Sequence, residues 1–257
     1  MSEKILIPLL CYNYGRFLSE CLDSIINQTY ENWKVVVRNP QSTDETDQVM
    51  THYVKNDSRI TYIKEKDSLS VGAARNRTIK ENPDFPIIAY HDVDDIMIFD
   101  RLERSIRGIR DSDLIYGNMR AFGVHHKVIA SFPYVNFKLL LNLDTIKAPT
   151  VCFRYEVWRD VDGFDESMKS ASDWDFWLRV SKAGFKFKYL NQILTLYRIH
   201  SKSITSFQHF NIFHPRGKNT QDMKYARSKH TSKHMGIKSA ILYLIILAYS
   251  RTKSKRF

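Results

Sequence analysis

Positions 87–95 carry the sequence IIAYHDVDD, in which an apolar run ends in three carboxylates. A short apolar run bounded by polar residues is typical of a buried strand, so we expect a strand over 86–91. The acids Asp92, Asp94 and Asp95 then follow its carboxyl end. Ligands of open α/β sheets bind at the carboxyl ends of strands, so this stretch is the first candidate for a site.

The residues before this stretch alternate between short apolar runs and helical patterns. The expected strands are at 4–10, 33–37, 60–63 and 86–91, and the expected helices at 16–27, 43–54, 72–80 and 101–109. Such alternation predicts an α/β fold with a Rossmann-like, mostly parallel central sheet flanked by helices. The strand ends at Leu10, Val37 and His91 should therefore meet at one edge of the sheet.

The pattern becomes irregular after residue 113. It predicts short antiparallel strands, then a helix and two more strands, at 114–137, 173–182, 185–190 and 194–197. Ser172 and Asp175 have the spacing of a capping box at the start of that helix. Beyond His200 the periodicity fades until an apolar segment at 237–249. The chain has 257 residues and 43% hydrophobic content, which suits one large domain.

The net charge of +11 lies in the C-terminal part of the chain. Residues 201–257 contain 12 Lys and Arg residues and one acid, Asp222, whereas residues 1–200 are balanced. The asymmetry favours an acidic partner, and the alternative is a solvated tail. The apolar run 240–249 is too short to span the ~30 Å of a bilayer. Its basic flanks suit peripheral contact with anionic lipid, and a helix packed on the domain is an equal alternative.

Cys11, Cys21 and Cys152 form neither an even set nor a Cys-x-x-Cys pair. The simplest interpretation is three reduced, buried thiols in a cytoplasmic protein. No secretory signal precedes the apolar run that begins at Ile5, which agrees with this location. The basic tail would allow a peripheral position on the inner face of a membrane.

Carboxylates as close as Asp92, Asp94 and Asp95 repel one another unless a cation lies between them. They suit a hard divalent ion such as Mg²⁺ or Mn²⁺, which prefers oxygen ligands. Such an ion could bridge two phosphates and neutralise a departing diphosphate. The alternative is a solvated loop before the helix near Asp100, and the Asp-x-Asp pattern alone favours that alternative.

A second acidic stretch opens the helix expected at 173–182. Acids in a first turn suit the helix dipole, so Asp173 and Asp175 could serve only to start the helix. The functional alternative is a general base, because a carboxylate partly desolvated beside Trp174 can have a raised pKa and accept an alcohol proton. Taken alone, the stretch favours the structural explanation.

Considered together, these segments resemble the family 2 glycosyltransferases, which are inverting enzymes with the GT-A fold. The resemblance covers roughly 4–205 and rests on eight segments in the family's order. They are ILIP at 5–8 with YNY at 12–14, SIINQTY at 24–30, STDET at 42–46, GAARN at 72–76, DVDD at 92–95, GFDE at 163–166, DWD at 173–175 and YRIH at 197–200. One motif is weak evidence, whereas eight in order are strong.

The resemblance implies an organisation and an activity. A glycosyltransferase domain at 1–205 would have a nucleotide-binding half at about 1–118 and an acceptor-side half at about 119–205, followed by a basic C-terminal extension at 206–257. The enzyme would transfer a sugar from a nucleoside diphosphate donor to a hydroxyl of a glycan or a lipid-linked glycan, as in polysaccharide biosynthesis. The implied cofactor is Mn²⁺ or Mg²⁺.

The resemblance also implies roles for single residues on the acceptor side. Asp173 would be the base that deprotonates the acceptor hydroxyl, with Trp174 and Asp175 beside it. The deprotonated oxygen would attack the anomeric carbon from the face opposite the diphosphate and invert its configuration.

On the donor side, the resemblance implies a metal site and a nucleotide site. Asp94 would bind the ion, supported by Asp95 and His200, and an ordinary surface position is the alternative for His200. For Arg75, a phosphate contact and a structural salt bridge are both open. The residues expected to contact the donor are Pro8, Tyr12, Asn13, Asn39, Arg75, Asp92 and Val93.

One segment departs from the family. Where the family usually has two aspartates and a glycine before Ser-Thr-Asp, this chain has Asn39, Pro40 and Gln41. In the family, an aspartate at this place commonly accepts a hydrogen bond from the imide N–H of uracil. Asn39 can accept through its amide oxygen and can also donate, whereas Pro40 has no N–H. Altered base recognition is therefore expected.

Other functions compete with this prediction. A nucleotide-sugar-binding protein that has lost catalysis would account for residues 39–41. A nucleic-acid-binding module would use the basic tail, but the balanced charge of 1–200 and the lack of a nucleic-acid motif argue against it. A glycoside hydrolase also uses paired carboxylates but needs no metal or phosphate site. No Gly-x-Gly-x-x-Gly follows the first strand, which argues against a dehydrogenase.

Overall fold

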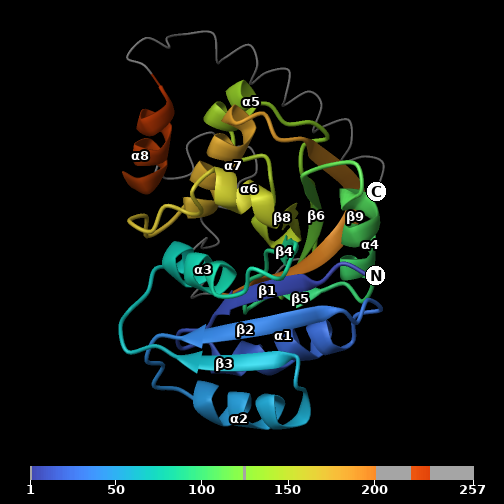
Figure 1. The fold of residues 1–257 in the computed structure, drawn as a ribbon, viewed down its shortest axis with the longest axis vertical. Helices are drawn as coiled ribbons and strands as arrows, with labels where there is room; N and C mark the ends of the chain where they lie inside the picture. The colour runs from blue at the N-terminus through green and yellow to red at the C-terminus, as the bar shows by residue number, and fades with distance from the viewer. Residues whose placement is uncertain (1, 124–125, 201–220, 232–257) are drawn as a thin grey trace.

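The computed structural model describes residues 2–123, 126–200 and 221–231, which form helices around one sheet (Figure 1). The strands are β1 Ile5–Leu10, β2 Trp33–Asn39, β3 Ile60–Lys64, β4 Ile87–Ala89, β5 Ile96–Met97, β6 Leu114–Gly123, β7 Val128–Ile129, β8 Cys152–Arg154 and β9 Phe187–Ile199. The helices are α1 Gly15–Ile26, α2 Thr46–Asn56, α3 Val71–Lys80, α4 Arg101–Ile109, α5 Phe137–Asn142, α6 Tyr155–Asp160, α7 Ser172–Lys182 and α8 Gln221–His230, with a 3-10 helix, η1, at Ala148–Thr150. The strand order is β3-β2-β1-β4-β8-β6-β9-β5, and β7 pairs with β6.

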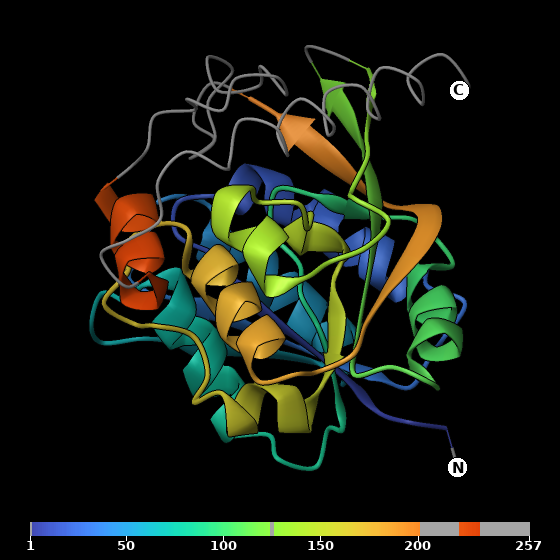
Figure 2. The ribbon, with the colours of Figure 1, turned by 90° about the horizontal axis from the view of Figure 1, so that it is seen from above.

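The N-terminal half contains the predicted parallel strands. β1 pairs in parallel with β2 and β4, and β2 pairs in parallel with β3. Because side chains alternate along a strand, Ile5 and Ile7 enter one core with residues of α1 and α4, while Leu6 enters a second core with residues of α3, α6 and α7. Helices therefore cover both faces of the sheet (Figures 1 and 2).

The C-terminal half differs from the prediction. β6 is one strand of 10 residues and β9 is one strand of 13 residues, where shorter strands were expected. They pair in parallel, with a register shift at Gly117 and Asn118. A Cβ at Gly117 would lie 2.7 Å from Leu194 Cδ1, so the glycine permits a close approach of the strands. The shift interrupts the alternation of side chains along both strands, which is why the sequence pattern is irregular here.

Helix α7 forms as predicted, but a capping box does not start it. The residue at the N-cap is Ala171, which has a left-handed φ of 56° and no capping side chain. The Asp175 carboxylate instead pairs with Arg179 Nε at 2.8 Å. The capping-box prediction for Ser172 and Asp175 is therefore wrong, because Ser172 already lies within the helix and the Asp175 carboxylate is paired with a cation.

The predicted extension at 206–257 contains one described helix, α8, which packs against α7 (Figure 1). The apolar segment 237–249 and its predicted membrane contact lie outside the described residues. Within the described ranges, every helix is too short or too polar to cross a bilayer. Cys11, Cys21 and Cys152 are free and buried, as predicted.

Candidate active site

Side-chain hydrogen bonds tie together the loops that follow β1 and β2. Asn13 N donates to Ser42 Oγ at 2.9 Å, and Asn13 Oδ1 accepts from Thr43 N at 2.8 Å. The φ of 55° at Asn13 is a left-handed conformation in which Asn is enriched. Tyr12 is 55% exposed beside it, so its ring is accessible to a ligand, whereas Pro8 is buried within β1.

Asn39 ends β2 and is 3% exposed. Its amide nitrogen donates to Tyr62 Oη at 2.6 Å and to Asp47 Oδ1 at 3.2 Å, and its oxygen accepts from Ser42 N at 2.7 Å. The backbone N–H can only donate, so these partners fix the orientation of the amide. Both amide hydrogens are engaged. Asn39 therefore offers a ligand the second lone pair of its oxygen, and acts as an acceptor.

Arg75 and Asp92 form an ion pair after β4. Arg75 Nη2 lies 2.6 Å from Asp92 Oδ1, and the guanidinium carbon lies 3.6 Å from the centre of the Tyr90 ring. Burial raises the pKa of Asp92 to about 6; Arg75 opposes the rise, and Asp94 and Asp173 add to it. Even so, 36% of the Asp92 side chain is exposed. The carboxylate is therefore partly accessible to a ligand. Of the two roles expected for Arg75, the structure contains the salt bridge.

Asp94 lies beside His200, which is distant in the sequence. His200 Nε2 is 3.0 Å from Asp94 Oδ2. The imidazole packs against Tyr14 and Phe17 near the start of α1, with ring centroids 5.7 and 4.7 Å away. The end of β9 thus brings together two residues expected at the metal. Val93, expected to contact the donor, is 6% exposed and packs in the core.

Asp95, the residue after Asp94, is 1% exposed. Its Oδ1 accepts from Arg198 N at 3.0 Å, while Oδ2 lacks a partner among the described residues. Burial raises the pKa of Asp95 well above its usual range, and Asp94 and Asp92 add to the effect. Asp95 therefore stabilises the loop by its hydrogen bond to the backbone of β9.

The acids of this loop suit a hard divalent ion by their chemistry. In the described parts of the chain, no three His, Cys, Asp or Glu residues are preassembled as a metal site. Asp94 and His200 offer two adjacent ligand groups, and Mg²⁺ in particular is commonly held by one or two carboxylates together with substrate phosphates. The incompletely compensated charge of Asp92 and Asp95 favours the same ion.

Asp173 lies in the first turn of α7, where its Oδ1 accepts from Trp174 N at 2.9 Å. Burial raises the pKa of Asp173, although this hydrogen bond and Arg75 oppose the rise. Sequence reasoning missed Asp144, which interacts electrostatically with Asp173. Burial raises the pKa of Asp144 to about 7, Lys147 lowers it and Asp173 raises it. Asp144 lies in a loop between α5 and η1, without a periodic pattern or a motif to mark it.

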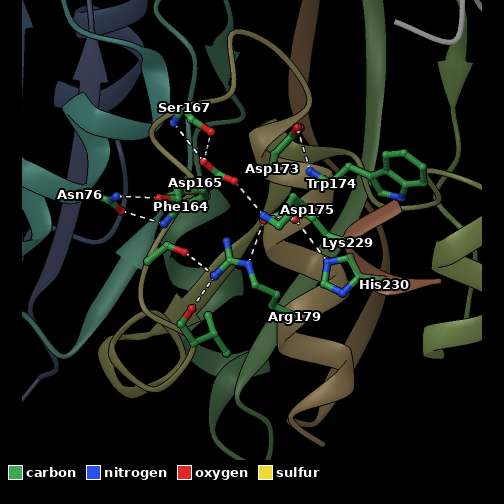
Figure 3. Close-up of polar contacts among 12 residues, drawn as sticks. Asn76, Phe164, Asp165, Ser167, Asp173, Trp174, Asp175, Arg179, Lys229 and His230 are labelled. Carbon is green, nitrogen blue, oxygen red and sulfur yellow. Dashed lines mark hydrogen bonds and ion pairs between the residues drawn. The ribbon is translucent and has the colours of Figure 1, made fainter. Parts of the chain in front are cut away.

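The other two residues expected on the acceptor side are buried. Trp174 is 1% exposed, and its indole N–H donates to Leu140 O at 2.8 Å. Asp175 is 0% exposed, and its carboxylate faces Arg179 and two residues of α8 (Figure 3). Neither side chain presents a surface to an acceptor. Both side chains are placed to fix helix α7, and their position on the acceptor side stays a prediction.

Two of the eight sequence segments meet each other. Asn76 Nδ2 donates to Phe164 O, and Asn76 Oδ1 accepts from Phe164 N, both at 2.8 Å (Figure 3). Trp158 Nε1 donates to the same oxygen at 2.9 Å. A hollow of about 1280 Å³ opens here between α3, α6 and residues 161–166. The residues predicted to be catalytic, donor-binding or metal-binding do not line it, so it is separate from the candidate active site.

Solved structures that align with this chain identify its fold. TarS of S. aureus in complex with UDP-GlcNAc aligns with a TM-score of 0.67 and 21% identity, over 78% of this chain and 60% of that one. The mannosyltransferase PcManGT from Pyrobaculum calidifontis, in complex with GDP-Man and Mn²⁺, aligns with a TM-score of 0.63 and 16% identity, over 79% of this chain and 59% of that one. The domain therefore has the GT-A fold, as expected.

The family model described as glycosyl transferase family 2 matches residues 6–160. The chain therefore belongs to this family and is a glycosyltransferase. The uncharacterized glycosyltransferase MJ1057 of Methanocaldococcus jannaschii is 25% identical over 211 residues, covering 77% of this chain and 72% of the relative. The O-antigen biosynthesis glycosyltransferase WbnJ of Escherichia coli is 27% identical over 211 residues, covering 78% and 82%. Escherichia coli chondroitin synthase is 26% identical over 198 residues, which is 74% of this chain but 28% of the relative.

Proposed function

We propose that this enzyme transfers a sugar from a nucleoside diphosphate to a hydroxyl of a glycan or lipid-linked glycan, with inversion at the anomeric carbon. The observation that carries the proposal is the environment of Asp92, whose pKa is raised by both Asp94 and Asp173. This electrostatic interaction supports one site in which the donor-side and acceptor-side carboxylates lie near one another. Several acids with perturbed pKa values in one cleft are typical of a functional site.

On the donor side, Asp94 and His200 would hold Mn²⁺ or Mg²⁺. When bound, the ion supplies positive charge that neutralises the departing diphosphate. Asp92 and its partner Arg75 orient the donor sugar and its phosphates. The nucleoside lies against the loops after β1 and β2, which carry Tyr12, Asn13 and Asn39.

On the acceptor side, Asp173 is the general base. Its raised pKa suits it to accept a proton from an alcohol. The hydroxyl proton moves to the Asp173 carboxylate while the acceptor oxygen forms a bond to the anomeric carbon. The bond from that carbon to the phosphate oxygen breaks, and the nucleoside diphosphate leaves from the opposite face. One displacement therefore inverts the configuration.

The relatives support a carbohydrate acceptor. WbnJ is named for O-antigen biosynthesis and another relative for chondroitin synthesis, which favours a role in polysaccharide biosynthesis. The structural neighbours contain UDP-GlcNAc and GDP-Man, so they leave the base open. Uracil and guanine both carry an N–H group that could donate a hydrogen bond to the oxygen of Asn39.

A donor screen tests the proposal. UDP-, GDP- and dTDP-sugars are incubated with the full chain, an acceptor mixture and Mn²⁺, and nucleotide release is measured with and without EDTA. Asp173→Asn should lower turnover by about 100-fold or more while donor binding persists, because the donor contacts lie on other elements. Asp84→Asn, which changes an exposed aspartate before β4, is the matched control.

The outcomes of this screen test the metal site, the base and the catalytic activity separately. Release that persists in EDTA would contradict the metal site, and full activity of Asp173→Asn would contradict the base. Donor binding without release from any sugar would favour the alternative, a nucleotide-sugar-binding protein that has lost catalysis.

A further inference from the structure

Helix α8 contacts residues 170–175 at three points, and the first lies just before α7. Asp222 Oδ2 accepts from Ser170 N and from Ser170 Oγ, both at 2.8 Å. The next residue, Ala171, has the left-handed φ of 56°. Such a conformation persists only where the surroundings hold it. Helix α8 therefore holds the chain at the turn that directs Asp173.

The second contact fixes the residue that follows Asp173. Arg227 Nε donates to Leu141 O at 3.0 Å, and its guanidinium carbon lies 5.5 Å from the centre of the Trp174 ring. Ala226, one residue earlier, is 0% exposed and belongs to the same core as Trp174. This part of α8 is therefore packed into the domain.

The third contact is with Asp175, two residues after Asp173 (Figure 3). Lys229 Nζ lies 2.9 Å and His230 Nε2 3.2 Å from Asp175 Oδ1, and Arg179 Nε lies 2.8 Å from Oδ2. Asp175 is 0% exposed, and a buried carboxylate is tolerated only when it is well paired. Two of these three nitrogen partners come from α8.

We infer that α8 is a positioning element for the catalytic base, and that Lys229 and His230 act through Asp175 to set the direction of Asp173. The inference rests on the proposed role of Asp173. A misplacement of about 1 Å can reduce a rate roughly 100-fold, so the packing of this helix affects the chemical step. The proposed donor contacts lie on α3 and at or after the ends of β1, β2, β4 and β9, so we expect a change in α8 to leave donor affinity unchanged.

The test compares two Lys→Met substitutions on α8 in the full chain. In Lys229→Met one of the three nitrogen partners of Asp175 is lost, together with the ion pair to Asp165 at 2.7 Å, whereas Lys224→Met changes an exposed lysine of the same helix. We expect Lys229→Met to lower kcat about 10-fold, with the donor KM and the Kd of the nucleoside diphosphate within twofold of the unsubstituted chain. Lys229→Arg should restore most of kcat. Lys224→Met should behave like the unsubstituted chain.

Amide hydrogen exchange over 172–177 provides a measurement that is independent of turnover. We expect faster exchange there in Lys229→Met than in Lys224→Met. If Lys229→Met fails to fold, Asp222→Asn, which weakens the contact with Ser170, is measured in the same way and should give the same pattern at smaller amplitude.

The outcomes separate the two proposals. Equal exchange in the variants, or faster exchange with an unchanged kcat, would overturn the positioning role. A lower kcat accompanied by weaker nucleotide binding would overturn it too, because the effect would then be general. If the unsubstituted chain turns over no donor, the proposed function fails, and exchange still decides whether α8 fixes the segment.

Discussion

Acids lie in two contrasting surroundings in this molecule. In the acidic loop, residues 92–95, the carboxylates crowd together, and the pKa values of Asp92 and Asp95 are raised by burial and by their neighbours. At helix α7, Asp175 is as little exposed as Asp95, yet its pKa is held well below the usual range by nitrogen partners, even though burial acts in the opposite direction.

The difference lies in charge compensation. Asp175 has three nitrogen partners within 3.2 Å, so the protein itself neutralises this charge and the residue serves the fold. Among the described residues, the three carboxylates of the acidic loop share two such pairs, Arg75 with Asp92 and His200 with Asp94. A carboxylate that binds a metal ion arriving with a ligand has to lack a full set of cationic partners within the protein. The number of cationic partners therefore distinguishes an acid that serves the fold, such as Asp175, from acids that face a ligand.

The sharpest way to break the comparison is to neutralise one acid of the loop. Asp94→Asn should lower turnover by about 100-fold or more, because the ligand for the ion is lost. The free energy of unfolding should stay within about 0.5 kcal/mol or rise, since repulsion within the loop is relieved. Kinetics with Mn²⁺ and urea unfolding in EDTA measure the two effects. A loss of several kcal/mol would show that Asp94 serves the fold.

The reciprocal change is made at helix α7. Asp175→Asn should lower the free energy of unfolding by about 3 kcal/mol, because cations that face a buried carboxylate lose their partner. The matched control is Asp160→Asn, which removes an exposed ion pair with Arg159 and should change stability by less than about 1 kcal/mol. Urea unfolding measures both. Equal effects would mean that burial adds nothing to the pairing.

Asn39 extends the comparison to an amide group whose two hydrogens both donate to protein atoms. Asn39→Asp should destabilise the protein by about 1–2 kcal/mol, since a carboxylate would replace the amide that donates to Asp47. Restoring the family's aspartate should therefore not tighten the binding of uridine nucleotides. The double variant Asn39→Asp with Asp47→Asn exchanges donor and acceptor and should recover part of the loss. Calorimetric titration with UDP and thermal unfolding test this pair, and tighter UDP binding by the single variant would contradict it.

The smallest expected effect is on pH dependence. The pKa of Asp92 is raised to about 6, against about 3.9 for an unperturbed aspartate. The folded state therefore holds this proton more tightly, and the stability contributed by Asp92 falls as pH rises from about 4 to 6. Because the side chain is 36% exposed, solvent screening keeps the change below about 1 kcal/mol.

Asp175 should show the opposite slope. Its pKa is lowered, so its contribution is present above about pH 3.9 and is lost as pH falls further. Urea unfolding of Asp92→Asn and Asp175→Asn in EDTA, between pH 3 and 7, measures both slopes against the unsubstituted chain. Slopes of the same sign would remove the basis of the comparison.

The donor side was largely predictable from the sequence, because its residues follow strands that local patterns reveal. Helix α4 begins at Arg101 and ends at Ile109, as predicted. The acidic loop follows β4 and was recognised from its composition and its place after an apolar run. Pro8 and Val93 are exceptions: the motif drew attention to them, but both are buried in the domain.

The acceptor side was harder to predict, since its residues depend on contacts across the chain. The start of α7 resembles a capping box, yet Asp175 is paired with Arg179 and α8. Asp144 lies in a loop without a periodic pattern, and Gly117 breaks the alternation in β6 that would have revealed a long strand.

The sequence by itself determined the family, the parallel strands and the acids that follow them, because these are properties of residues adjacent in the chain. The tertiary structure alone decided which acids are compensated: it brings His200 to Asp94, and Lys229 and His230 to Asp175. Electrostatic interactions depend on distance in space and on burial, and neither quantity can be obtained from separation along the sequence.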